Sequence, residues 1–127
     1  GGPVTRTRKS AKAAGTRFER QVADWLATTL ADDRIDRRVR NGIKDRGDVA
    51  GVRAHGRRVV LELKDVSRTD LSGWVREAHI EAGNDDALVG LVVHKRRGTG
   101  DPGEQYVTCT LADLVALLIG ERPGGEA

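Results

Sequence analysis

Cysteine is almost missing from this chain of 127 residues, in which Cys109 stands alone. A single thiol excludes an internal disulfide and any zinc site built from several cysteines. Histidine is also scarce, and His55, His79 and His94 lie in three separate segments, so a histidine zinc site is not expected. Apolar runs are short, and none approaches the roughly 20 residues that span a bilayer. Since no signal-peptide pattern opens the chain, we expect a soluble intracellular protein without a membrane partner.

The length allows one domain with a single hydrophobic core. Charged residues make up 32% of the chain and apolar residues 38%, a balance that still supports folding. Residues 1–14 are polar, and we expect them to form a flexible basic arm. We expect a single folded domain over 15–120 and a disordered tail over 121–127.

Basic residues are clustered, although the net charge is only +3. One cluster lies in the expected arm, and the other occupies the segment before residue 47. Such clusters indicate a phosphate-binding track, while the alternative is a set of solvated arginines without a partner. The candidate DNA-binding residues are Arg6, Arg8, Lys9, Lys12, Arg37, Arg38, Arg40, Lys44 and Arg46.

Hydrophobic periodicity and turn signals predict an α/β fold. Apolar residues recur at helical spacing over 16–30, and the run over 87–95 is typical of a strand that is buried on both faces, which favours buried parallel pairing there. Thr110 with Asp113 resembles a helix N-terminal cap. The expected elements are, in order, a helix over 16–30, strands over 35–40, 48–53 and 57–64, a helix from residue 69 or 70 to 84, strands over 87–95 and 104–110, and a helix over 111–120.

The stretch GDVAGVRAHGRRVVLELK, residues 47–64, places acids and an amine close together. In the strand over 57–64, alternation sets Glu62 and Lys64 on the face opposite Val59, Leu61 and Leu63. A hairpin through residues 55–56 would bring Asp48 close to that strand end.

A third carboxylate is expected to join this cluster. Glu19 lies at the edge of the apolar stripe of the first helix, where it would reach the same sheet. Three carboxylates around one point repel one another unless a cation lies between them, and oxygen ligands suit Mg²⁺, with Mn²⁺ as a substitute. Hydrolysis of a phosphodiester is the chemistry that such a site supports, with Lys64 orienting or deprotonating the attacking water.

The residues Glu19, Asp48 and Glu62-Leu63-Lys64 resemble the active-site motif of the PD-(D/E)XK nuclease superfamily. The string GTRFERQVADWL, residues 15–26, is similar to the first helix of archaeal and phage Holliday junction resolvases. The element order matches that family's restriction-endonuclease-like αβββαβ core, with a central mixed sheet flanked by helices. The resemblance covers roughly residues 15–119 and departs at Gly47, where the motif has proline.

The resemblance implies a Mg²⁺-dependent homodimeric endonuclease that cleaves branched DNA, such as four-way junctions, in DNA recombination and repair. It implies a cytoplasmic, nucleoid-associated location in a host or phage-infected cell. Asp48 and Glu62 would be metal ligands together with the backbone carbonyl of Leu63, Lys64 the catalytic lysine, and Glu19 the additional acid and ligand.

Three alternatives stay open. One is a general or restriction-type nuclease that acts on linear duplex, and another is a non-cutting DNA-binding module with the same fold. Acids beside phosphates weaken binding, so the presence of Asp48, Glu62 and Lys64 together argues against a pure binder. The third alternative is that Glu62 and Lys64 form only a strand-end ion pair, and that Glu19 is a solvated partner of Arg17 or Arg20.

Overall fold

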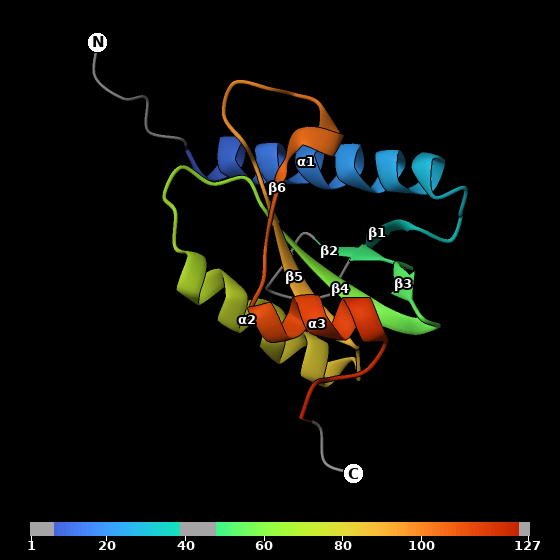
Figure 1. The fold of residues 1–127 in the computed structure, drawn as a ribbon. Helices are drawn as coiled ribbons and strands as arrows, with labels where there is room; N and C mark the ends of the chain where they lie inside the picture. Colours follow the sequence, from blue (N-terminus) through green and yellow to red (C-terminus); the bar gives the residue numbers. More distant parts are fainter. Residues whose placement is uncertain (1–6, 39–47, 125–127) are drawn as a thin grey trace.

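The structure is a computed structural model that describes residues 7–38 and 48–124, except for the side chains of Arg38 and Asp48. This part of the chain forms three α-helices and an open mixed sheet of six strands (Figure 1). The α/β class expected from the sequence is therefore confirmed. None of the helices in these two ranges is long and apolar enough to cross a membrane.

Helix α1 spans Arg8–Thr29 and begins well before the expected start near residue 16. The Thr7 side chain caps it by accepting a hydrogen bond from the Ser10 backbone N–H, which satisfies one of the free donors of the first turn. Ala14 is already buried against the core. Residues 8–14 are therefore helical, and the flexible arm expected there is wrong for these positions, because capping and alanine content favour a helix in spite of the polar composition.

The sheet has the strand order β1-β2-β4-β5-β6, and the short β3 pairs with β4 beside this path. The central pair, β4 with β5, is parallel, and every other pair is antiparallel. The parallel pairing expected for the run over 87–95 is thus confirmed for its contact with β4. The strands are β1 Asp36–Arg38, β2 Asp48–Ala50, β3 Arg53–Ala54, β4 Arg57–Lys64, β5 Val89–His94 and β6 Tyr106–Thr108.

One expected strand, over 48–53, is divided into β2 and β3. Gly51 lies between them with φ of 92°, and a Cβ atom there would lie 2.4 Å from the carbonyl oxygen of Arg34. The chain therefore turns at a position that only glycine occupies without strain. The turn expected at His55 and Gly56 is confirmed, and both residues have positive φ.

The helices cover both faces of the sheet. On one face, Val59, Leu61 and Leu63 of β4 share the main core with Phe18 of α1 and Ala116 of α3, the helix that spans Leu111–Ile119. This confirms the alternation expected for β4. On the other face, helix α2, which spans Leu71–Asn84, packs Trp74 and Ala78 against Val92 of β5.

The last strand is shorter than expected. Glu104 belongs to a short 3-10 helix, η1, over Pro102–Glu104, and β6 begins at Tyr106 and pairs antiparallel with β5. The expected strand over 104–110 is wrong at both ends, because η1 takes the first residue and Thr110 caps α3 through a complete capping box with Asp113. The cap expected at Thr110 is confirmed, and Asp70, one of the two positions at which the second helix was expected to start, caps α2.

Candidate functional site

A cavity of about 200 Å³ lies between α1, the end of β4 and α2. The elements that form it are the ones on which the sequence placed candidate residues. Its charged lining consists of Glu19 and Lys12 of α1, Glu62 and Lys64 of β4, Asp65, and Glu77 of α2.

Glu62 is the most deeply buried of the candidate residues, with 1% of its surface exposed. Its Oε2 atom is buried and has no hydrogen-bond partner among the residues that the structure describes. Its Oε1 atom lies 3.8 Å from the Nζ atom of Lys64, which is an ion-pair distance longer than a hydrogen bond. A buried carboxylate oxygen in this state destabilises the fold unless a cation or a hydrogen-bond donor compensates it.

Asp48 occupies the position directly opposite Glu62 in the antiparallel ladder of β2 and β4. Opposite positions in such a ladder belong to one face of the sheet. The sequence predicted that a hairpin would bring these two positions together, and the backbone register confirms it. The side chain of Asp48 lies outside the described part of the structure.

Lys64 is held by a residue that the sequence interpretation missed. Its Nζ atom donates a hydrogen bond of 2.9 Å to Oε2 of Glu77, an α2 residue that also lines the cavity. A signal for Glu77 was present in the sequence, because it lies three residues after Trp74 and one before Ala78, at the border of the inner face of α2. Glu19 occupies the corresponding border position on the first helix.

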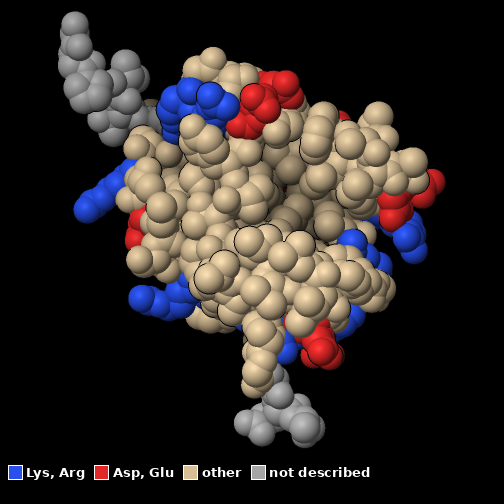
Figure 2. All heavy atoms as spheres, in the orientation of Figure 1, with Lys and Arg blue, Asp and Glu red and all other residues tan. Residues whose placement is uncertain are grey.

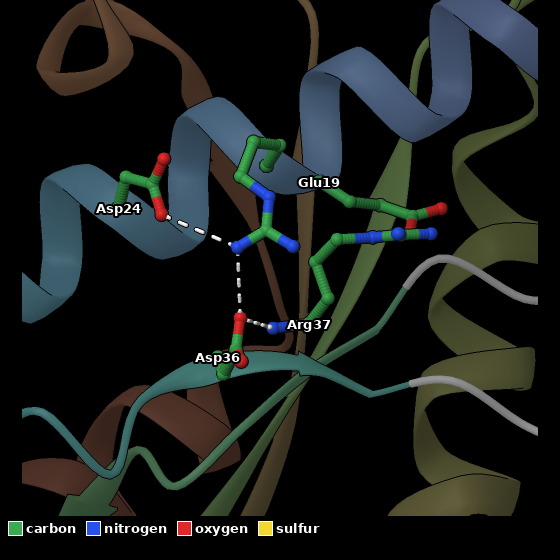
Figure 3. A network of polar contacts seen from close by, with 5 residues as sticks. Glu19, Asp24, Asp36 and Arg37 are labelled. Atoms are coloured by element: carbon green, nitrogen blue, oxygen red, sulfur yellow. Dashed lines mark hydrogen bonds and ion pairs between the residues drawn. The ribbon is translucent and has the colours of Figure 1, made fainter.

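Glu19 faces inward, as the sequence predicted, and only 5% of its surface is exposed. Its Oε2 atom accepts a hydrogen bond from Nε of Arg37 at 3.0 Å and lies 2.9 Å from Nη2 of the same guanidinium. Figure 3 shows the two side chains lying alongside each other between α1 and β1. Arg17 and Arg20 were the expected alternative partners, but Arg20 pairs with Asp24 and Asp36 instead.

Arg37 was expected to contact DNA, and in the structure its guanidinium is engaged within the protein. The side chain is 18% exposed and is held against a buried carboxylate, so its charge balances Glu19. Sequence clustering could not distinguish this internal arginine from its neighbours. Which arginine pairs with a buried acid depends on which one the folded structure brings close to it.

The other candidate DNA-binding residues divide between described and undescribed parts of the chain. Arg8, Lys9 and Lys12 lie on the first turns of α1, where Arg8 and Lys9 are exposed and Lys12 lines the cavity. Arg38 belongs to β1, but its side chain is outside the described residues. Arg6, Arg40, Lys44 and Arg46 also lie outside the described residues.

A second polar cluster joins α2, α3 and the C-terminal segment, away from the cavity. Asp113 is 1% exposed and lies 2.7 Å from Nε2 of His79 and 2.6 Å from Nη1 of Arg122. Burial acts to raise the pKa of Asp113, but the hydrogen bonds from His79, the Thr110 backbone and Arg122 outweigh it, so the pKa is lowered. This carboxylate fastens three segments together.

Among the described residues, no three His, Cys, Asp or Glu side chains form a group arranged to hold a metal ion. The Asp48 side chain is not included in that set. No protein-family model, curated protein or solved structure matches this chain.

Proposed function

We propose that this chain is a metal-dependent endonuclease that hydrolyses phosphodiester bonds in branched DNA, with the four-way junction as its substrate. The observation that carries the proposal is the buried carboxylate of Glu62. One of its oxygens has no hydrogen-bond partner in the described part of the chain, and it lines a cavity together with the amine of Lys64. An ionised group in this environment is costly unless a cation compensates it.

The donor set fits a hard divalent cation, Mg²⁺ or Mn²⁺, because such ions take carboxylate oxygens as ligands. Glu62 and Asp48, which oppose each other in the ladder, would hold the ion. Glu19 and the backbone carbonyl of Leu63 would be the further ligands that the family resemblance implies. When bound, such an ion neutralises phosphate charge and lowers the pKa of a water molecule.

The protein's own residues would do the remaining work. Lys64 presents its ammonium to the cavity, where it would donate hydrogen bonds to a phosphate oxygen and to the attacking water. Arg37 balances the charge of Glu19, so that this acid is tolerated beside Glu62 and a polyanionic substrate. Burial of Glu62 places its carboxylate in an environment of low dielectric constant, which strengthens its electrostatic interactions.

Lysines and arginines of α1 supply a surface for the DNA backbone. Arg8 and Lys9 are exposed on the first turn of α1, and Lys12 lies on the wall of the cavity, so a strand held by these residues would pass the candidate site. The preference for branched over linear DNA rests on the resemblance of residues 15–26 to the first helix of junction resolvases.

The face that carries α3 and β6 supports the expected homodimer. Figure 2 shows that this face has few charged side chains and that charges gather around its edge. Tyr106, Val107, Leu111 and Leu118 are all more than half exposed. A patch of this kind, with a charged rim, is typical of a protein interface and unsuited to DNA. Sedimentation at micromolar concentration should give the mass of a dimer, and a monomer would contradict this pairing.

The proposal is tested with a labelled synthetic four-way junction and a linear duplex of equal length. Wild type, Glu62→Gln and the control Glu104→Gln are each assayed with Mg²⁺ and with a chelator. Glu104 is an exposed acid of η1 that pairs with Arg96 and does not line the cavity. We expect wild type and Glu104→Gln to nick the junction symmetrically only with Mg²⁺, and Glu62→Gln to bind without cutting.

Three results would change this conclusion. Equal cleavage of junction and duplex would retain the metal site but reject the junction preference. Tight binding without cleavage under any divalent metal would leave a DNA-binding module. Cleavage that survives Glu62→Gln would show that the cavity is not the active site.

A further inference from the structure

We infer that Glu77 of α2 is a positioning residue, which holds the Lys64 ammonium beside Glu62 and keeps it from closing to hydrogen-bond distance of that carboxylate. This inference rests on the proposed function, since it assigns a task within the same cavity. Glu77 lies outside the motif on which the resemblance was based, and it comes from a helix on the opposite side of the sheet from α1.

The distances around Lys64 carry the inference. Its Nζ atom lies 2.9 Å from Oε2 of Glu77 and 3.8 Å from Oε1 of Glu62. The amine therefore hydrogen-bonds to the half-exposed acid and stays beyond hydrogen-bond distance of the buried one, whose side chain is only 1% exposed. Lysine has three donors, so one bond to Glu77 leaves two for a substrate.

Without Glu77, the amine would have a different preferred partner. Glu62 has a buried oxygen that lacks a hydrogen bond from any described residue, and a free ammonium nearby would be attracted to it. Closure of Lys64 onto Glu62 would occupy the carboxylate needed for a cation and withdraw the amine from the substrate. Glu77 competes with that closure, so it keeps both groups available.

The position of Glu77 is fixed by the packing of α2. Trp74 and Ala78, which flank it in the helix, are buried against β5. At Gly90 of β5 the helix comes so close that a Cβ atom would lie 2.2 Å from the Ala78 carbonyl oxygen. Because α2 is packed closely on the sheet, the position of the Glu77 side chain is well defined. Glu77 can therefore hold the flexible side chain of Lys64 in one place.

A purely structural role for the Lys64–Glu77 pair makes different predictions. An ion pair between a helix and a strand, partly exposed on one side, contributes little to stability. If that were its only role, Glu77→Ala would lower the melting temperature slightly and leave the rate of cleavage unchanged. A positioning role instead affects the chemical step, and an acceptor at the same place should restore it.

The test compares wild type, Glu77→Ala, Glu77→Gln and the control Glu104→Ala. Single-turnover cleavage of the four-way junction is measured at saturating protein, together with the dissociation constant in Ca²⁺ or chelator. We expect Glu77→Ala to slow cleavage about tenfold, because a displaced catalytic group loses its alignment. Binding should change less than about twofold, since the inference gives Glu77 a role in holding Lys64 and no contact with phosphate. Glu77→Gln keeps an acceptor oxygen and should recover most of the rate.

A second readout needs no activity. The side-chain ammonium of Lys64, labelled with ¹⁵N and assigned by its loss in Lys64→Arg, should give a slowly exchanging NMR signal in wild type and Glu77→Gln. Glu77→Ala should shift or broaden it, and Glu104→Ala should not. An unchanged signal together with an unchanged rate in Glu77→Ala would overturn the inference. If wild type cuts no DNA, the proposed function fails, and the NMR comparison alone decides whether Glu77 positions Lys64.

Discussion

Glu62 of β4 lies directly opposite Asp48 of β2 in an antiparallel ladder, and Glu62 lines the cavity of the candidate site. Thirteen intervening positions form a turn at Gly51, the short β3 and a second turn at His55 and Gly56. The pairing is therefore produced by local hairpin geometry. Opposite ladder positions belong to one face of the sheet, as the proposed metal site requires, and the first prediction concerns the Glu62 member of the pair.

Replacing Glu62 by glutamine should stabilise the free protein while it removes the metal response. A buried carboxylate with an unpartnered oxygen costs stability, and the neutral amide should recover about 1 kcal/mol of unfolding free energy. Mg²⁺ should raise the melting temperature of wild type and not that of the variant, because a ligand stabilises only the form that binds it. Thermal denaturation with and without Mg²⁺ measures both effects. A variant that is less stable and still responds to Mg²⁺ would contradict the metal site.

Arg37 and Lys9 should differ in their contribution to DNA binding, although the sequence placed them in the same class. Arg37 is held by Glu19, so Arg37→Ala should destabilise the fold and leave the salt dependence of binding unchanged. Lys9 is exposed on α1, and Lys9→Ala should reduce the slope of log affinity against log salt by about 1. Binding titrations at several salt concentrations measure the slopes. Equal slope changes for both variants would show that Arg37 leaves Glu19 to contact phosphate.

Gly90→Ala should disturb the packing of α2 against β5 and lower the stability of the protein, whereas Gly83→Ala should not. A Cβ atom at residue 90 would lie 2.2 Å from the Ala78 carbonyl oxygen, so the helix has to move, at a cost of about 2 kcal/mol. At residue 83, inside the same helix, no atom beyond the local helix backbone lies within 4 Å of an added Cβ, and alanine should stabilise by up to about 1 kcal/mol. Urea denaturation of both variants tests this contrast. Loss of stability in Gly83→Ala would show that the environment of α2 is not as described.

Lowering the pH should weaken the hydrogen bonds and ion pairs of Asp113 that hold α3 in place. The pKa of Asp113 is lowered from its ordinary value of 3.8, since hydrogen bonds from His79, Thr110 and Arg122 outweigh its burial. A lowered pKa means that the ionised group stabilises the fold fully above pH 3.8, and that this contribution is lost as the pH falls through the lower, folded-state value. Asp113→Asn should therefore destabilise the protein by about 2 kcal/mol at neutral pH.

The same variant gives the control for this acid dependence. The stability difference between wild type and Asp113→Asn should shrink below pH 3.8, where the wild-type carboxyl also becomes protonated on unfolding. Denaturant titrations at pH 7, 4 and 3 measure the difference. A constant difference across this range would assign the effect to packing of the amide and not to charge.

Local chemistry in the sequence determined much of this fold. The caps at Asp70 and Thr110, the turn at His55 and Gly56, and the alternation along β4 depend on neighbouring residues only, so each was predictable. The register of Asp48 with Glu62 followed from the same hairpin. The early start of α1 at Arg8 was also a local effect, but the polar composition of residues 8–14 obscured it.

Tertiary structure alone decided which charged groups meet. Arg37 pairs with Glu19, which is 18 positions earlier in the sequence, and Lys64 bonds to Glu77 on a helix that crosses the other face of the sheet. His79, Asp113 and Arg122 come together from separate segments. Charge clustering along a chain cannot predict such pairs, because electrostatic interactions depend on distance and burial in space. The candidate acids and the lysine could be predicted from the sequence. Their partners were decided by the packing of α1 and α2 around the end of β4.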